Sequence, residues 1–158
     1  MKANRSLGAH LVQDGLVTAD QLGEANELFL QKLRSDDADE ASLLHSLIYG
    51  LQAIPEKVLI HHQVETLGMD FLPLANYMVQ MHWVRRELLR PCMFTRTVAI
   101  DQMEDITFLC SAYYMSPTVR HFWESQFKGT CLWFISSLEE IEKVVYRLYM
   151  QNPELISA

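Results

Sequence analysis

The side chains that most often carry chemistry are few in this sequence, and they form no catalytic pattern. His61-His62 with Glu65 has the spacing of a helical metal site, but adjacent histidines point in different directions on a helix. We therefore expect one surface histidine, one half-buried histidine and no metal. Lys128-Gly129-Thr130 resembles the end of a phosphate-binding loop, yet no glycine-spaced turn precedes it. Without a nucleophile–base pair or a carboxylate pair, the sequence predicts a protein that is not an enzyme and has no cofactor.

Three arginines form the basic cluster of the chain: Arg85, Arg86 and Arg90. Such a cluster either binds a phosphate or an acidic partner, or forms a solvated helix face. Both interpretations stay open at this point. We treat the three arginines as candidate partner-binding residues.

Composition limits the classes of protein that this chain can belong to. The formal net charge of −7 over 158 residues argues against a nucleic-acid-binding protein, which normally has a basic surface. The hydrophobic content of 49% is typical of a globular protein, with room for one domain or two small subdomains. The sequence has no signal peptide and no apolar run of membrane-spanning length. Together with three cysteines in apolar surroundings (Cys92, Cys110, Cys131), this predicts a cytoplasmic protein with reduced thiols.

The elements that must position any site begin with a helical motif over residues 7–22. Its apolar residues share one face of a helix: Leu7, Leu11 and Val12. Gly15 supplies the left-handed residue that ends this helix. Thr18 and Gln21 have the spacing of a capping box, which predicts a second helix over residues 19–34.

This motif resembles the N-terminal domain of the type II secretion and type IV pilus assembly ATPases. The hallmark of that family is Leu-Gly-x-x-Leu-Val-x-x-Gly-Leu-[Ile/Val]-[Ser/Thr]-x-x-x-Leu, which residues 7–22 match. In the family, an ATPase core follows this domain. The core is absent from this sequence, and we therefore expect either an excised domain or a freestanding relative.

In related proteins this module binds cyclic di-GMP, and the resemblance implies which residues would hold it here: Arg5, Leu7, Gly8, Leu11, Val12, Gly15 and Gln31. In those binders, an arginine directly before Leu-Gly meets guanine or phosphate, apolar side chains pack on the bases, and a glutamine ends the second helix. Arginine suits the role because its planar fork stacks and donates paired hydrogen bonds. Here Ser6 precedes Leu7, and Arg5 lies one position earlier. The glutamine position falls on Phe29, with Gln31 nearby.

A degenerate second copy of the motif follows an acidic linker at residues 35–40. Its apolar stripe repeats the first: Leu43, Leu44, Leu47 and Ile48. We expect Gly50 to end this helix and Pro55 to be the first residue of the next one.

The second copy lacks the residues that the resemblance assigns to the ligand. Ser42 replaces the arginine, Leu44 replaces the glycine, and Thr66 replaces the glutamine. The Leu44 side chain fills space that the ligand would need. The second half-site is therefore predicted to be lost, whereas the first is altered. A simpler interpretation also stays open, in which the leucines of both copies only form the core of a helical bundle.

The rest of the chain changes from a helical to a mixed pattern. A short helix is expected over residues 83–89, ending before Pro91. Further elements are expected in this order: strands over 94–100 and 106–110, a helix over 116–127 that Gly129 ends, a strand over 131–135, and a last helix capped by Ser137. The predicted fold class is α+β. Two helix-turn-helix repeats over residues 1–74 precede a small β-β-α-β-α sandwich over residues 75–158, in one compact unit.

The resemblance implies a non-catalytic module that docks onto a membrane-anchored secretion or pilus assembly protein and couples a motor or membrane enzyme to it. We expect such an adaptor to expose an apolar or charged face on its α/β half. It would lie at the inner membrane through its partner, without inserting and without binding a nucleic acid polymer. The alternative is a cyclic di-GMP receptor domain that regulates an attached ATPase or glycosyltransferase. An enzyme is the remote third hypothesis.

Overall fold

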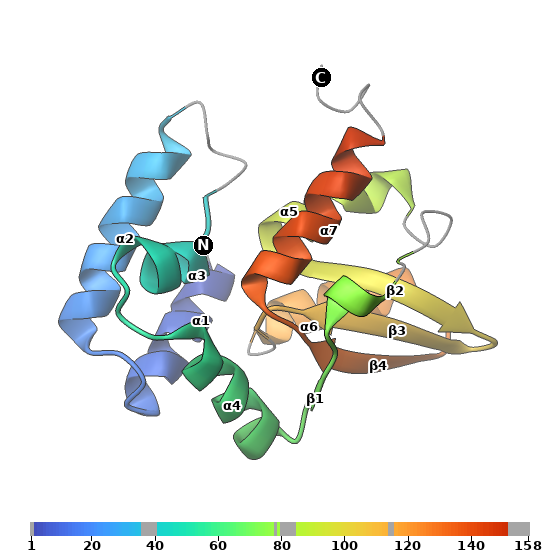
Figure 1. The fold of residues 1–158 in the computed structure, drawn as a ribbon, viewed down its shortest axis with the longest axis horizontal. Helices are drawn as coiled ribbons and strands as arrows, with labels where there is room; N and C mark the ends of the chain where they lie inside the picture. Colours follow the sequence, from blue (N-terminus) through green and yellow to red (C-terminus); the bar gives the residue numbers. More distant parts are fainter. Residues whose placement is uncertain (1, 36–40, 78, 80–84, 114–115, 152–158) are drawn as a thin grey trace.

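The computed structural model describes residues 2–35, 41–77, 79, 85–113 and 116–151 (Figure 1). The predicted linker at 36–40 lies outside these residues. The described chain begins with helices only: α1 (Lys2–Gln13), α2 (Ala19–Leu33), α3 (Leu43–His45), the π-helix η2 (Ser46–Gly50) and α4 (Glu56–Leu67). Short strands and helices alternate after them: β1 (Asp70–Phe71), η3 (Leu74–Asn76), η5 (Arg86–Leu88), α5 (Leu89–Thr95), β2 (Thr97–Met103), β3 (Ile106–Ser111), α6 (Pro117–Gln126), β4 (Thr130–Ile135) and α7 (Leu138–Met150). The predicted α+β class is confirmed.

The start of α2 follows the sequence prediction. The Thr18 hydroxyl oxygen accepts a hydrogen bond from the Gln21 backbone N–H at 3.1 Å, and the Gln21 side chain accepts one from the Thr18 N–H at 2.9 Å. Two of the N–H groups at the helix start are thus satisfied. Ser116 and Ser137 cap α6 and α7 in the same way, each accepting from the backbone N–H three residues later.

The sheet has four strands in the order β1-β4-β3-β2. β2 and β3 form an antiparallel hairpin, and β3, β4 and β1 run parallel to one another. The predicted order of two strands, a helix, a strand and a helix is confirmed. The two-residue strand β1 was not predicted, because Asp70 and Phe71 are too few to show a period.

The element before the first long strand differs from the prediction. A helix was expected to end before Pro91, and a strand to begin near Phe94; instead α5 contains both residues. Pro91 is the third residue of α5, where its missing N–H leaves no helical hydrogen bond unmade. The strand starts at Thr97, after Arg96 ends the helix in the left-handed region (φ 49°). The first residues of the predicted helix over 83–89 lie outside the described chain.

Helices cover both faces of the sheet (Figure 1). α6 lies behind it, where the Glu124 carboxylate accepts a hydrogen bond from the Trp133 indole at 3.2 Å. α7 and η3 lie in front, where the Tyr77 hydroxyl donates to Asp101 at 3.1 Å. The part of the front face nearest the β2–β3 turn has no helix over it in the described structure (Figure 1).

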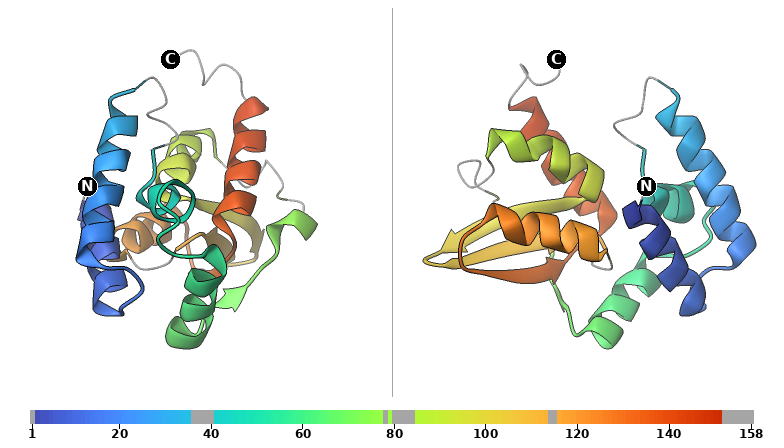
Figure 2. Two further views of the ribbon diagram at one scale, coloured as in Figure 1. Left: turned by 60° about the vertical axis from the view of Figure 1, so that its left-hand side comes forward. Right: turned by 180° about the vertical axis from the view of Figure 1, so that it is seen from behind.

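The helical half and the sheet half stand side by side (Figures 1 and 2) and contribute to one continuous cluster of buried side chains. Its fully buried members from the helical half include Leu11, Leu47 and Leu59, as the leucine pattern predicts. Trp123 and Leu109 are fully buried members from the sheet half. A division of the chain at residue 74 stays a prediction. No helix of the described structure is long and apolar enough to cross a bilayer.

Candidate functional site

The residues assigned to cyclic di-GMP by resemblance divide into buried and exposed ones. Leu7 and Leu11 are 9% and 0% exposed and belong to the core, and Val12 packs against it. Arg5, Gly15 and Gln31 are exposed. The leucines therefore reach a ligand only if the helices separate.

Gly8 lies where α1 crosses α2. A Cβ atom at this position would stand 2.8 Å from both methyl carbons of Leu22. Real Cβ contacts are not this short, so a larger residue would require Leu22 to move. The close approach of two helices therefore explains this glycine without any ligand.

Gly15 has the role that its position in the motif predicts. Its φ of 69° places it in the left-handed region. The Leu16 N–H donates to the Leu11 carbonyl at 2.9 Å, and the Gly15 N–H donates to the Val12 carbonyl at 3.0 Å. These two bonds form a Schellman motif, which satisfies carbonyls at the end of α1.

Arg5 and Gln31 are not brought together by the helices that carry them. α1 and α2 run antiparallel and meet at Gly8 and Leu22 (Figure 2). At 1.5 Å per residue, Arg5 lies about 4–5 Å along α1 from that meeting point, and Gln31 about 13–14 Å along α2. Their backbones are thus about 9 Å apart along the helix pair. Arg5 has no ion-pair partner in the described part of the chain.

The second copy of the motif is filled by its own side chains. Ser42, at the arginine position, caps α3 by accepting from the His45 N–H at 3.3 Å. Leu44, at the glycine position, is 6% exposed and belongs to the core. Thr66, at the glutamine position, lies 3.2 Å from the His62 Nδ1 atom.

The end of the second copy confirms the prediction for Gly50 and corrects the one for Pro55. The helix ends at Gly50 as predicted, and the left-handed residue that follows it is Gln52, with φ 50°. The π-helix η2 widens the last turn, so the Leu51 N–H donates to the Ser46 carbonyl and the turn closes later. Gly50 faces α2, where a Cβ would stand 3.4 Å from Leu28. Pro55 is the N-cap of α4, one residue before the helix.

The arginine cluster has a structural contact that the sequence does not reveal. The Arg85 guanidinium donates to the Gln126 carbonyl at 2.8 Å and lies 5.6 Å from the centre of the Phe127 ring. Arg85 thereby neutralises the negative end of α6. Arg86 and Arg90 are exposed. Their role as partner-binding residues stays a prediction.

The histidine pair has the positions that were expected. His61 is exposed and lies 3.1 Å from Glu65, whereas the half-buried His62 lies 3.2 Å from Asp14. Within the described residues, no three His, Cys, Asp or Glu side chains are arranged to hold a metal ion.

The cysteines are poor nucleophiles in this environment. Cys92 and Cys110 are fully buried, and burial raises the pKa of Cys92 to about 12. Burial also raises the pKa of Cys110, and the nearby Glu140 carboxylate adds to the effect. The half-buried Cys131 has a pKa raised by desolvation. At neutral pH all three are thiols rather than reactive thiolates.

Sequence reasoning missed a set of polar contacts that join the two halves. Glu56, at the start of α4, accepts hydrogen bonds from the Leu138 N–H at the start of α7 and from the Tyr49 hydroxyl at 3.1 Å. The fully buried Gln63 donates to the Ala112 carbonyl at 3.1 Å. We call these contacts the joint; its residues are Tyr49, Glu56, Gln63, Ala112 and Leu138. No signal in the sequence marks the two contacts between the halves, because their partners are 49 and 82 residues apart.

A buried tyrosine lies near the joint. The Tyr113 hydroxyl is buried without a hydrogen-bond partner, and its pKa is raised by burial and by the negative charge of Asp14. Asp14 follows the end of α1 and also contacts His62. The Asp14 carboxylate, at the end of α1, thus acts electrostatically on Tyr113, which follows β3.

No family model matches the sequence, and no curated protein matches it. Solved structures do match the fold. A structure of MshE with cyclic di-GMP is similar with a TM-score of 0.54 at 20% identity, over 90% of this chain and 98% of that chain. Two crystal forms of the N-terminal domain of XpsE are similar with TM-scores of 0.53 and 0.51, both at 12% identity. They cover 92% of this chain and 94% and 95% of theirs.

These similarities define the class of fold. The chain has the fold of the N-terminal domain of secretion and pilus ATPases, as the sequence resemblance predicts. The match includes both the helical repeats and the sheet, since nine-tenths of the chain is covered.

Proposed function

We propose that the chain is a non-catalytic regulatory domain that docks a motor or membrane enzyme onto a membrane-anchored secretion or pilus assembly protein. The observation that carries the proposal is the fold match to N-terminal domains over both halves of the chain. Within the described residues no three His, Cys, Asp or Glu side chains are arranged to hold a metal ion, and burial raises the pKa of Cys92 to about 12. Attachment to the inner membrane would then come from the partner.

The joint gives such a domain a way to couple its halves. Glu56 belongs to the helical half, yet its carboxylate occupies the positive N-terminal end of α7 in the sheet half. A partner that displaces α7 would also disturb the contact between α4 and Tyr49 of η2, because the Leu138 N–H and the Tyr49 hydroxyl both donate to the Glu56 carboxylate.

Photocrosslinking in the cells of origin tests docking directly. A benzophenone amino acid is placed singly at exposed positions of each half, Leu132 on the sheet and Leu30 on α2. We expect a discrete adduct with one membrane-associated protein from at least one half. If neither half gives an adduct while the protein is folded and abundant, the docking function is wrong.

A cyclic di-GMP receptor is the second candidate, favoured by the MshE structure with this ligand and by the exposed Arg5. Three observations weigh against it: the buried leucines of the first motif, the Leu22 side chain over Gly8, and Leu44 in the second copy. If the site is retained, Arg5→Ala will abolish binding without altering the fold.

A further inference from the structure

Part of the front face of the sheet carries apolar side chains that no element of the described chain covers. The strand register places Met103 beside Ile106, and Phe108 beside Leu132, in two neighbouring rows of one face. Met103, Ile106 and Leu132 are 62%, 37% and 42% exposed. The half-buried rings of Phe108 and Phe134 lie on the same face, with centroids 6.1 Å apart. We call these five residues the open sheet face.

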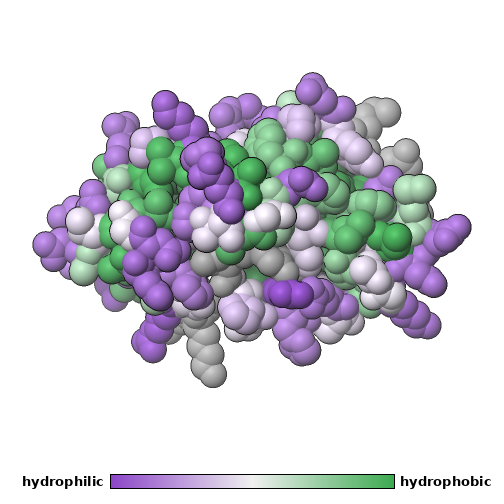
Figure 3. Space-filling view, turned by 90° about the horizontal axis from the view of Figure 1, so that it is seen from below, coloured by the Kyte–Doolittle hydropathy of each residue, from purple (hydrophilic) through white to green (hydrophobic). Residues whose placement is uncertain are grey.

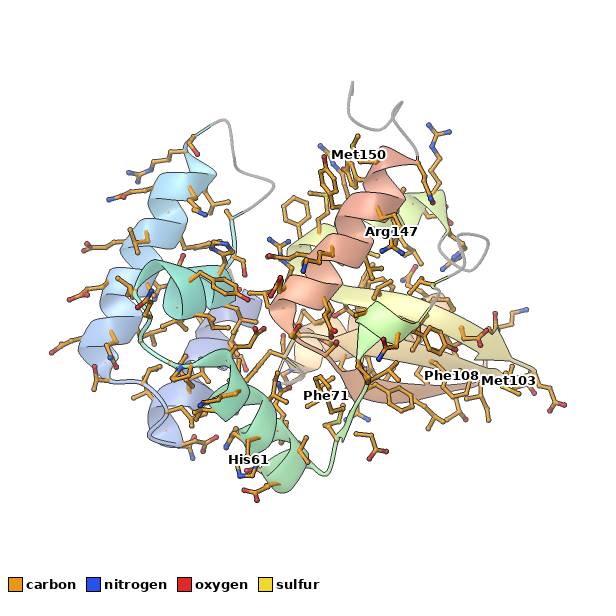
Figure 4. The ribbon with its side chains drawn as sticks, viewed as in Figure 1. His61, Phe71, Met103, Phe108, Arg147 and Met150 are labelled. Atoms are coloured by element: carbon orange, nitrogen blue, oxygen red, sulfur yellow. The ribbon has the colours of Figure 1, made fainter. Side chains whose placement is uncertain are left out.

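Figure 4 shows two residues of this surface. Met103 and Phe108 lie along the front of the strands, away from α7 (Figure 4). Seen from below, hydrophobic residues lie among hydrophilic ones on both halves of the molecule, the half that holds the sheet included (Figure 3). Soluble proteins rarely expose several neighbouring large apolar residues unless the surface binds something.

The charges around the open sheet face are mainly acidic. Glu104 and Asp105 form the turn beside Met103 and Ile106. Asp70 on β1 pairs with Phe134, and Asp101 pairs with Phe108. Lys128 is the basic residue at this end of the sheet in the described chain, two residues before β4. The rim therefore favours a cationic partner.

We propose that the open sheet face binds an amphipathic helix of a partner protein, with an apolar stripe and flanking lysine or arginine residues. This inference rests on the proposed docking function and names its surface and the chemistry of its partner. A second copy of the chain fits poorly, because a symmetric contact would place the two acidic rims against each other. An anionic membrane surface fits poorly for the same reason.

A helix can be placed beside α7 on the part of this face that no described element covers. α7 already lies on this face over the carboxyl ends of β3 and β4, while α6 covers the opposite face (Figure 1). A helix placed beside α7 would complete the helical layer on the front of the sheet. The apolar stripe of such a helix would cover the rows that begin at Met103 and Phe108.

The test uses the whole chain and a synthetic probe. The probe is a fluorescent peptide of about 18 residues, or five helical turns, with leucine at helical spacing and lysine on both flanks. Binding is measured by anisotropy, and the contact is mapped by amide chemical shifts in an NMR spectrum. We expect saturable binding with shifts concentrated in β2, β3 and β4. Shifts concentrated elsewhere would contradict the proposal.

Matched variants separate this surface from general hydrophobic binding. Met103→Ser with Leu132→Ser should weaken binding at least tenfold, whereas Leu30→Ser with Tyr146→Ser, which are 41% and 67% exposed, should not. Asp70→Asn with Glu104→Gln should weaken binding severalfold at low salt. Equal affinity in all variants would overturn the proposal.

Control probes test the other occupants. A peptide with glutamate in place of lysine should not bind. Anionic vesicles that bind the wild-type chain but not the Met103→Ser, Leu132→Ser variant would show a membrane site instead. Self-association lost in that variant would show a second copy instead. An adduct from α2 together with no peptide binding would overturn this inference while leaving the docking function intact.

Discussion

At the scale of single residues, the two glycines of the hallmark motif have structural roles that require no ligand. Gly8 lets α1 approach Leu22, and Gly15 ends α1 in the left-handed region. The glycines of the hallmark motif are therefore explained by the packing and the end of α1, before any ligand is considered. Cyclic di-GMP binding would need side chains that contact the ligand, and Arg5 is an exposed arginine beside the first motif that could do so.

Two helical glycines give a matched test of this packing role. Gly23 has open space around its missing Cβ, so Gly23→Ala should stabilise the protein by about 0.5–1 kcal/mol through helix propensity. Gly8→Ala gains the same propensity but forces Leu22 from its rotamer, which costs about 0.5–1.5 kcal/mol. In urea unfolding, Gly8→Ala should therefore raise the free energy of unfolding by less than Gly23→Ala does. In a Leu22→Ala background, the difference between the two sites should disappear; if it persists, the contact with Leu22 is not its cause.

Glu124 predicts a pH dependence of stability. The hydrogen bond from Arg120, helped by one from Trp133, lowers the pKa of this carboxyl against the opposing effect of partial burial. Because the pKa of Glu124 is lower in the folded state, its ionised carboxylate stabilises the fold. This stabilisation is complete above the unfolded-state pKa of about 4.3 and is lost as the pH falls through the folded-state pKa.

Glu124→Gln should therefore reduce the loss of stability on acidification below about pH 5. Urea unfolding at several pH values measures this effect, with the exposed Glu24→Gln as the control. Identical acid sensitivity in wild type and Glu124→Gln would contradict the assignment.

At the scale of elements, the turn between β2 and β3 depends on one glycine outside it. Gly129 has φ 88°, and a Cβ there would stand 2.0 Å from the Asp105 carbonyl oxygen. Because backbone cannot move aside like a side chain, Gly129→Ala should destabilise the protein by about 2–4 kcal/mol. Gly68, with φ 61° and open surroundings, is the matched control and should lose only about 1 kcal/mol on substitution by alanine. Similar losses in thermal unfolding would contradict the steric explanation.

Most elements could be predicted from local signals, and the exceptions have physical causes. Capping residues located the starts of α2, α6 and α7, since a cap acts within one turn. Pro91 was interpreted as a helix stop, although a proline in the first turn of a helix breaks no hydrogen bond. The left-handed Gln52 could not be predicted, because glutamine has no preference for that region.

The candidate site was less predictable than the fold. Apolar residues assigned to a ligand by resemblance, such as Leu7 and Leu11, carry the same sequence signal as core residues. The joint depends on pairs such as Glu56 with Leu138, which are 82 residues apart. Neither burial nor distant pairing is visible in a single sequence.

At the scale of the whole molecule, the joint predicts that the two halves unfold together. All three tryptophans (Trp83, Trp123, Trp133) belong to residues 75–158, so fluorescence reports that half, whereas circular dichroism reports helices of both. The two thermal transitions should coincide.

Glu56→Ala removes the acceptor at the start of α7 and should cost about 1–3 kcal/mol. It should lower both transitions together, by about 2–4 °C per kcal/mol. A variant that shifts only one transition would show that the halves are independent.

We propose that this fold serves docking and that its own core side chains fill the place where the resemblance puts cyclic di-GMP. Calorimetric titration of the purified chain with cyclic di-GMP, with GMP as the control ligand, tests that claim most directly. We predict no saturable heat at millimolar ligand, for the wild type and for Arg5→Ala alike. Saturable binding at micromolar affinity that Arg5→Ala abolishes would contradict the account and make the chain a cyclic di-GMP receptor.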